Sequence, residues 1–344
     1  MTLFTQSTFK TLSRVQSLSW RGDELVDWVG GGNAFTLDGT EHLAVTRYAY
    51  RFDAAVASPN GDLAVIYEKF GTKGLIVREG EIVREIDRSY YLAGSYEYPV
   101  ALFNAPDGRL LLAHCPEEYC QIEFEDAETG ISLAKSIERR PADFFHSRLA
   151  ANRSGTRLLS AGWLWHPFHR VVHFDVRAAL TNSQLLDNGE IIGRRGEYNI
   201  NCEESTACWL GENCIAIAAS SNAEDPAEGD EVPEEPRLLP RGLAIYDLPN
   251  SEYLGSFKYD EPLGTIVAVG TQHILSLYQH PKLIEVATGK ILYLWSKLQS
   301  GLQQSSIVGG LVNSQMPPPY AFDPEKMRFA IANGKSITVL QFHL

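Results

Sequence analysis

Cysteine and histidine are the residue types in this chain whose spacing could support metal chemistry. Of the five cysteines, Cys115 and Cys120 have four residues between them, and five residues separate each of Cys202, Cys208 and Cys214 from the next. Zinc sites usually combine a tighter Cys-x-x-Cys pair with a second pair or with histidines. Cysteine is also among the residues most often buried as a small hydrophobe. The spacing therefore favours buried thiols, and we expect no metal and no cofactor.

The histidines and the glycine-rich segment give no catalytic assignment. His166, His169 and His173 have a spacing that suits a helix, but their surroundings are typical of a loop followed by a strand, which favours a structural or interface role. Residues 30–33 read Gly-Gly-Gly-Asn, without the Lys-Ser/Thr of a phosphate-binding loop. No nucleophile elbow or metalloprotease helix is present. The sequence identifies no catalytic residues, and these stay unknown.

Composition restricts the classes of partner. The 344 residues carry a net charge of −13. An acidic body repels nucleic acid and anionic membranes, so we expect neither as the main partner. An odd number of cysteines without a dense disulfide pattern favours a reducing compartment. The first 20 residues lack the apolar core of a signal peptide, and no window approaches a membrane span. We expect a cytoplasmic protein that is a monomer on its own.

A weak repeat runs through the whole chain. Its unit is a short apolar strand, a tight polar turn and a second strand, then a loop, a third strand ending in Asp or Glu, a turn and a fourth strand, as in residues 98–137. The glycines of three first turns, Gly61, Gly108 and Gly155, are each 47 residues apart. Seven such turns occur, near residues 22, 60, 107, 154, 212, 271 and 325. Four short strands repeated seven times are typical of a β-propeller.

The repeat resembles the WD-repeat and YVTN-type propeller superfamily. The resemblance is to the shape of the repeat, since no Trp-Asp pair closes a third strand. It implies an all-β fold, a seven-bladed β-propeller of four-stranded antiparallel blades that spans residues 1–344 as a single domain. The competing fold is a pair of stacked β-sandwiches. The best candidate for a helix is residues 292–304.

The two ends of the chain predict how the ring closes. The last repeat supplies three strands and then the chain ends, whereas residues 3–9 form a spare strand ahead of the first turn. An unsealed ring would leave exposed sheet edges, which soluble proteins avoid. We therefore expect the N-terminal strand to join the C-terminal blade.

One face of the predicted propeller is rich in aromatic and basic side chains. The second-to-third loops and the connections between blades share this face, called the loop face below, and the first-to-second turns lie on the opposite turn face. Tyr, Trp and Arg dominate binding hot spots, although many of these rings could instead fill the gaps between blades. The candidate binding residues are Tyr48, Tyr50, Arg51, Tyr91, Tyr96, Tyr98, Arg140, Phe145, His146, Trp165, His166, Phe168, Arg195, Tyr198, Tyr278 and His280.

An acidic insertion of about residues 220–237 is the other candidate for binding. Residues 220–236 contain seven acidic residues and three prolines with no Lys or Arg, which predicts a solvated loop or an arm that attracts a basic partner. The sequence thus favours a non-enzymatic protein-binding scaffold or an inhibitor-type adaptor for a protein partner, with a basic protein as one candidate. The alternative is an enzyme, a hydrolase or lyase, that acts on a small molecule or glycan in the central channel.

Overall fold

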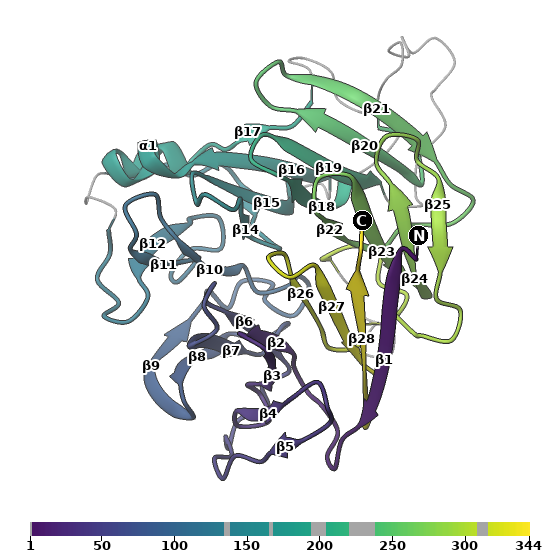
Figure 1. Ribbon diagram of the computed structural model, residues 1–344. Coiled ribbons are helices and arrows are strands. Elements are labelled where there is room, and N and C mark those ends of the chain that lie inside the picture. Colours follow the sequence, from purple (N-terminus) through teal and green to yellow (C-terminus); the bar gives the residue numbers. More distant parts are fainter. Residues whose placement is uncertain (1, 134–137, 165–167, 194–203, 220–237, 308–315) are drawn as a thin grey trace.

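Seven small antiparallel sheets follow one another along the described part of the chain (Figure 1). The computed structural model describes residues 2–133, 138–164, 168–193, 204–219, 238–307 and 316–344. In sequence order, the strands of the first three blades are β2 (Ser19–Arg21), β3 (Glu24–Asp27), β4 (Asn33–Phe35) and β5 (Glu41–His42); β6 (Ala54–Ala57), β7 (Leu63–Tyr67), β8 (Lys73–Arg78) and β9 (Glu81–Asp87); and β10 (Val100–Asn104), β11 (Leu110–His114) and β12 (Glu123–Asp126).

The remaining four blades continue around the ring. Their strands are β13 (Phe144–Phe145), β14 (Ala150–Ala151), β15 (Arg157–Leu164), β16 (Phe168–Asp175) and β17 (Glu190–Ile191) in blade 4; β18 (Glu204–Leu210), β19 (Cys214–Ala219), β20 (Gly242–Asp247) and β21 (Glu252–Lys258) in blade 5; β22 (Thr265–Val269), β23 (His273–Tyr278), β24 (His280–Glu285) and β25 (Ile291–Leu294) in blade 6; and β26 (Tyr320–Asp323), β27 (Arg328–Ala332), β28 (Ser336–Phe342) and β1 (Phe4–Lys10) in blade 7.

Each of the seven predicted turns connects the innermost strand of its blade to the next strand of that blade. The turn near residue 107, for example, joins β10 to β11, and Gly108 takes a φ of +87° there. Gly155 has the strictest requirement, because a Cβ on it would lie 1.8 Å from the carbonyl oxygen of Asn104 in the neighbouring blade. In the seventh turn, which contains no glycine, Met327 takes the positive φ of +51°. The spacing of the turns therefore predicted the blades correctly.

Hydrophobic clusters show that the sheets form a closed ring. Among the described residues, one cluster lies in each of the seven interfaces between neighbouring blades. The cluster between blades 7 and 1 contains Leu25 and Phe35 from blade 1 and Ile337 and Val339 from blade 7. A pair of stacked sandwiches would not bury seven successive interfaces in this order. The all-β propeller and its WD-repeat-like shape are confirmed.

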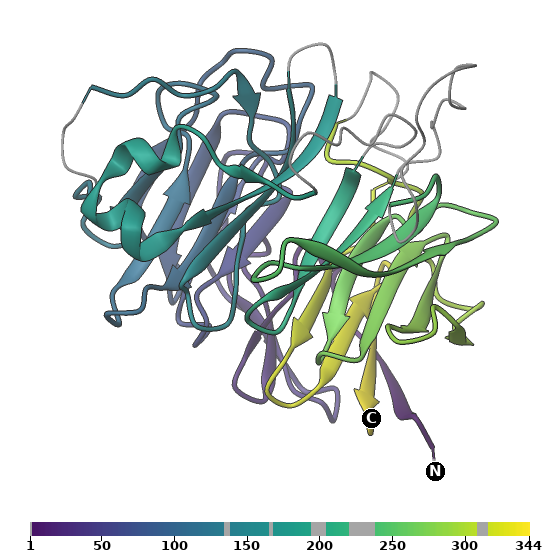
Figure 2. The ribbon, with the colours of Figure 1, turned by 90° about the horizontal axis from the view of Figure 1, so that it is seen from above.

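The N-terminal strand closes the ring as predicted. β1 pairs antiparallel with β28 over seven residue pairs, from Phe4 opposite Phe342 to Lys10 opposite Ser336. The two termini consequently lie close together, as Figures 1 and 2 show from two directions. The Phe4 ring packs 4.7 Å from that of Tyr293 and 4.8 Å from that of Trp295, measured between ring centroids. These contacts also attach β1 to blade 6.

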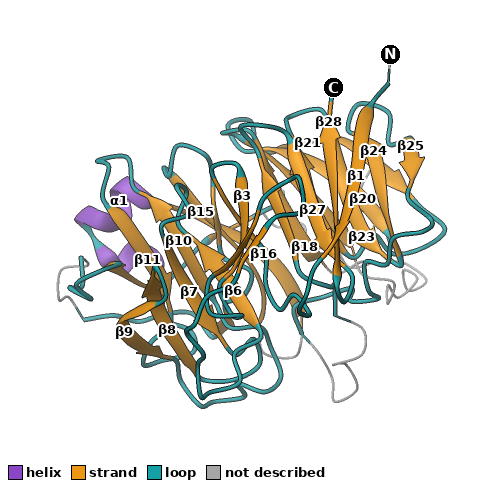
Figure 3. Cartoon of the chain, turned by 60° about the horizontal axis from the view of Figure 1, so that its bottom comes forward, coloured by secondary structure: helices purple, strands orange, loops and turns teal. Residues whose placement is uncertain are grey.

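Two details differ from the expected repeat. Blade 3 has three strands within the described residues, and its fourth position is represented by a single bridge between Glu125 and Ser132. The helix predicted at residues 292–304 is wrong, because this region begins with β25 and continues without helix. A short helix occurs instead at α1 (Val176–Thr181), followed by a 3-10 turn at η1 (Ser183–Leu186) on the outside of blade 4 (Figure 3). Asp175 caps α1 by accepting a hydrogen bond from the Ala178 N–H.

Candidate functional site

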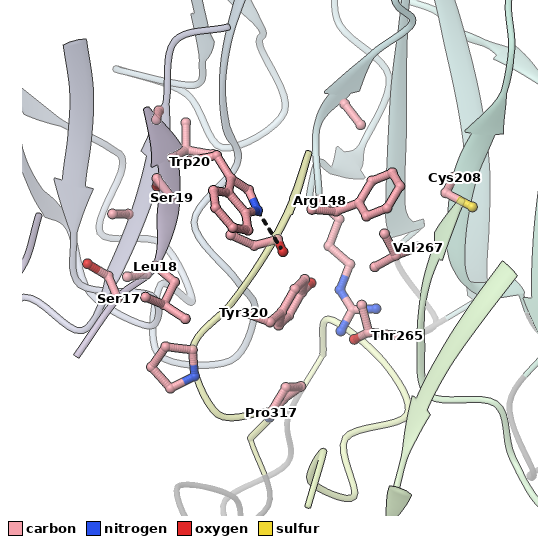
Figure 4. Close-up of a pocket in the computed structure, with 18 of the residues that line it drawn as sticks. Ser17, Leu18, Ser19, Trp20, Arg148, Cys208, Thr265, Val267, Pro317 and Tyr320 are labelled. Carbon is pink, nitrogen blue, oxygen red and sulfur yellow. Dashed lines mark hydrogen bonds between the residues drawn. The ribbon is translucent and has the colours of Figure 1, made fainter. Parts of the chain in front are cut away.

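A central channel of about 2490 Å³ runs along the propeller axis. The innermost strand of every blade contributes to its wall: β2, β6, β10, β14, β18, β22 and β26. In Figure 4, Trp20 lies against β26, where its indole N–H donates to the carbonyl oxygen of Ala321 over 3.4 Å. The Arg148 side chain reaches from blade 4 toward Tyr320 in the same view. The channel is therefore lined by a mixture of apolar, aromatic and charged groups.

Residues 295–307, called the crossing segment below, leave blade 6 and pass over the channel on the loop face. In the middle of the segment, the Gln279 N–H of blade 6 donates to the carbonyl oxygen of Gly301 over 2.6 Å. Further along, the Ser305 hydroxyl lies 2.9 Å from Nε2 of His169 in blade 4. Near its end, Ile307 forms a bridge with Tyr96, which belongs to the connection between blades 2 and 3. This segment therefore joins blades that lie far apart around the ring.

An ion pair beneath the crossing segment fixes its position. Arg148 lies 3.3 Å from both carboxylate oxygens of Glu97, and Gln303 of the crossing segment donates to Glu97 Oε1 over 2.6 Å. Burial opposes ionisation of Glu97, but Arg148 and Lys69 outweigh it and hold the pKa of this carboxyl below its usual range. Glu97 therefore accepts hydrogen bonds from both Arg148 and Gln303 at the mouth of the channel. Catalysis in the channel stays an untested alternative.

A row of stacked aromatic rings lies beside the channel mouth, over blades 3 and 4. The ring of Phe145 is at its centre, with centroids 4.2 Å from Trp163, 4.4 Å from Tyr119 and 5.3 Å from Tyr96. Tyr91 covers the outer side, 4.9 Å from Tyr119 and 5.9 Å from Phe145. Stacked and edge-to-face pairs of this kind each add about 0.5–1.5 kcal/mol beyond area burial. Phe145 and Tyr119 therefore form the packed layer on which the Tyr91 ring lies.

Arg88 holds the loop that carries Tyr91. Arg88 is 2% exposed, and its guanidinium carbon lies 4.5 Å from the ring centroid of Tyr96 and 4.9 Å from that of Tyr98. It donates to the carbonyl oxygen of Gly71 over 2.7 Å and to those of Ala93 and Tyr96 over 2.5 and 3.1 Å. A planar guanidinium satisfies several carbonyls at once in a way that lysine cannot. Arg88 therefore determines the shape of the connection between blades 2 and 3.

Residues 89–95, called the Tyr91 loop below, present large side chains to solvent. Tyr90, Tyr91 and Leu92 are 79%, 49% and 38% exposed. Leu92 has a φ of +51°, a conformation that non-glycine residues adopt at some cost in free energy, and the Ser95 N–H donates to its carbonyl oxygen over 2.8 Å. The loop is thus ordered by internal hydrogen bonds although its apolar side chains are unburied.

The structure divides the predicted binding residues into several groups. Exposed on the described surface are Tyr50, Arg51, Tyr91 and Arg140. Partly buried are Tyr48, Tyr278 and His280. Four are buried: Tyr96, Tyr98, Phe145 and His146. Trp165, His166, Arg195, Tyr198 and the side chain of Phe168 lie outside the described residues.

The four buried residues have roles in packing. His146 is 3% exposed, and burial lowers its pKa to about 3, so the ring is neutral. Its Nδ1 lies 3.2 Å from the Ser160 hydroxyl and its Nε2 lies 3.2 Å from the carbonyl oxygen of Cys120. Such side chains support the loop face from below and offer no area to a partner. Conversely, Tyr90 and Leu92 are exposed and Tyr119 is partly buried beside Tyr91, although none of the three was among the candidate binding residues.

The described cysteines have thiols of raised pKa. Burial raises the pKa of the Cys115 and Cys120 thiols, and that of Cys208 to about 12. Within the described residues, no group of three or more His, Cys, Asp or Glu side chains is arranged to hold a metal ion. Cys202 lies outside those residues. A low thiol pKa is what makes a cysteine nucleophilic, so the raised pKa of the buried Cys115 and of the partly buried Cys120 and Cys208 suits them to packing.

Comparison with known proteins supports the fold. No protein-family model matches this sequence, and no curated protein sequence matches it. Among solved structures, the chain is similar to one in the crystal structure of the mitotic checkpoint complex, with a TM-score of 0.61 and 10% identity. The alignment covers 98% of this chain and 95% of the other. At this identity the similarity establishes the propeller fold alone. No helix in the described residues is long and apolar enough to cross a membrane.

Proposed function

We propose that this chain is a non-enzymatic protein-binding scaffold, or an adaptor of the inhibitor type, that grips its partner with the loop face. The single observation that carries this proposal is the Tyr91 loop, where three large side chains are exposed on a backbone held by Arg88. Tyrosine supplies much contact area for little conformational entropy. A loop that is ordered before binding loses less entropy on association. Both properties favour recognition of a protein.

Other features of the molecule agree with this role. The similar solved chain belongs to a structure of a complex. The exposed Tyr50 and Arg51 lie on the connection between blades 1 and 2, which precedes the connection that carries the Tyr91 loop. We propose the cytoplasm as the compartment and a monomer as the free state, both on the sequence evidence given above.

The proposal is tested by affinity capture from a native lysate with matched variants. Tyr90→Ser with Tyr91→Ser removes the apex of the Tyr91 loop, and Tyr293→Ser on β25 removes a ring of similar exposure, 43%, from the outer edge of blade 6. We expect proteins captured by the parent chain to be lost with the double variant and retained with Tyr293→Ser. Capture of the same proteins by all three chains would contradict the proposal. Melting curves check that each variant is folded.

Arg88→Lys tests whether order in the Tyr91 loop matters. Lysine keeps the positive charge but cannot reach the carbonyls of Gly71, Ala93 and Tyr96 together. Loss of one buried hydrogen bond to a charged group costs about 1.5–3 kcal/mol. We expect amide hydrogen exchange in residues 89–97 to accelerate at least about tenfold, since each 1.4 kcal/mol is a factor of ten. Partner capture should weaken in parallel; faster exchange with unchanged capture would show that loop order is irrelevant.

A further inference from the structure

The wall of the central channel is more positive than the chain as a whole. Among the described residues, five basic and four acidic side chains line it, whereas the whole chain has 30 basic and 43 acidic residues. Two of these cations, Arg14 and Lys69, and one of the carboxylates, Asp53, form no ion pair with another described residue. Low-dielectric walls focus the field of charges in a cleft. The channel therefore favours an anion although the molecule as a whole is acidic.

Lys69, in the loop between β7 and β8, has an ammonium group that is available to a ligand. Its backbone is fully used, because its N–H donates to Oδ1 of Asp53 over 2.7 Å and its carbonyl oxygen accepts from the Tyr98 N–H over 2.8 Å. The side chain is partly buried in the channel wall and forms no hydrogen bond with another described residue. An ammonium group carries three donors. The backbone therefore fixes the position of Lys69 and leaves its charge free.

Two tyrosine hydroxyls lie at the same end of the channel. Tyr67 is the last residue of β7 and Tyr320 is the first of β26, so both are at the loop-face end. Neither hydroxyl bonds to another described residue, and both are accessible from the channel, unlike the enclosed hydroxyls of Tyr96 and Tyr98. Burial raises the pKa of Tyr67 and of Tyr320, and the Glu97 carboxylate adds to the rise. Both hydroxyls therefore stay protonated and can donate.

Glu97 connects these groups into one cluster. The charges of Arg148 and Lys69 both act on its carboxyl, and its own charge acts on Tyr67 and Tyr320. Figure 4 shows Arg148 extending toward Tyr320. The Glu97 carboxylate is neutralised by Arg148 and also accepts a hydrogen bond from Gln303. The unused groups of the cluster are thus the ammonium of Lys69 and the two tyrosine hydroxyls, all of which are donors.

We propose that the loop-face end of the central channel binds a small anion, whose carboxylate or phosphate oxygens accept hydrogen bonds from Lys69, Tyr67 and Tyr320. Hydrogen bonds between an ammonium and an anionic oxygen are about twice as strong as those between neutral groups. A few convergent polar groups in a pocket fix the orientation of its ligand. The site does not depend on the scaffold function above, because it lies in the channel and not on the Tyr91 loop.

Isothermal titration calorimetry with citrate and with inorganic phosphate, at a constant ionic strength of about 150 mM, tests the site. We expect saturable binding of at least one probe, and the tighter one identifies carboxylate or phosphate as the recognised group. Lys69→Met should weaken that binding at least about tenfold, and Tyr67→Phe with Tyr320→Phe about tenfold. Both changes remove only side-chain groups without a hydrogen bond, so the melting temperature without anion should not fall.

Matched controls separate the site from adventitious binding of an anion. Lys258→Met removes an exposed, unpaired lysine from β21, and Tyr293→Phe removes a hydroxyl from β25. Each should leave the affinity unchanged within about twofold. Equal weakening by Lys258→Met and Lys69→Met would overturn the proposal, as would tighter binding of neutral glucose or no saturable binding of either anion. Tyr90→Ser with Tyr91→Ser should bind the anion normally even where it loses the captured partner.

Discussion

Deletion of residues 1–12 removes β1 and should open the ring. β1 is the outer strand of blade 7, and it comes from the opposite end of the chain to the other three strands of that blade. Without it, the whole edge of β28 from Ser336 to Phe342 loses its hydrogen-bonding neighbour. Unpaired strand edges promote association between chains. We therefore expect both a loss of stability and aggregation.

The size of the effect can be worked from the contacts of β1. Seven residue pairs with β28 correspond to about seven backbone hydrogen bonds, each with a net contribution of about 1 kcal/mol. The two aromatic contacts of Phe4 add about 1 kcal/mol each. The total of about 9 kcal/mol lies within the 5–15 kcal/mol by which domains are usually stable. Deletion should thus remove most of the free energy of unfolding.

The assay is urea denaturation followed by tryptophan fluorescence, together with size-exclusion chromatography. The truncated chain should unfold at much lower urea or aggregate, and a synthetic peptide of residues 1–12 should restore part of the stability by binding to β28. Thr5→Val, at an exposed position of β1, is the control and should change the free energy of unfolding by less than about 0.5 kcal/mol. A truncated chain that unfolds at the same urea concentration as the parent would refute the reasoning.

Two further changes test particular contacts. Gly155→Ala should destabilise the chain by more than about 2 kcal/mol in urea denaturation, because a Cβ would meet a carbonyl oxygen of blade 3, whereas Gly334→Ala, at nearly the same φ but in open space, should cost about 1 kcal/mol. Equal costs would remove the steric argument. Burial opposes ionisation of Glu125, but His114 and Arg84 hold its pKa in the folded chain below the ordinary value of 4.5. The contribution of the Glu125 carboxylate to the free energy of unfolding is therefore present above pH 4.5 and is lost as the pH falls below that value. Glu125→Gln should therefore cost about 1.5–3 kcal/mol at pH 7 and progressively less toward pH 3, and a cost that does not change with pH would contradict the assignment.

The sequence was sufficient to predict the propeller because local turns repeat at regular spacing. Gly61, Gly108 and Gly155 each take a positive φ between the first two strands of a blade, and only short-range geometry is needed to recognise them. The closing strand was also predictable, because the last repeat lacks a fourth strand and the N-terminal segment contains one strand that belongs to no other repeat. The reduction of the fourth strand of blade 3 to a single bridge, within the described residues, was not predictable, because residues 127–133 carry the same kind of turn as the other blades.

The candidate site was harder to predict because exposure depends on contacts that are distant in sequence. Tyr91 and Tyr96 occur in one short tyrosine-rich segment, yet Tyr91 is half exposed and Tyr96 is fully buried. Tyr96 is buried by Phe145 and by Ile307, which arrives from the connection between blades 6 and 7. No local pattern encodes that crossing. Tyr119 was not predicted as a binding residue because its contacts with Tyr91 and Phe145 join segments that are distant in sequence.

The central claim is that the Tyr91 loop contacts a protein partner, and site-specific photocrosslinking tests it most directly. p-Benzoylphenylalanine is placed at position 91 in one chain and at position 293 in another, since both tyrosines are about half exposed but lie on different surfaces. Each chain is irradiated in native lysate and adducts are identified by mass spectrometry. We expect a protein adduct at position 91 that is absent at position 293. The same adducts at both positions, or adducts at position 293 alone, would contradict it.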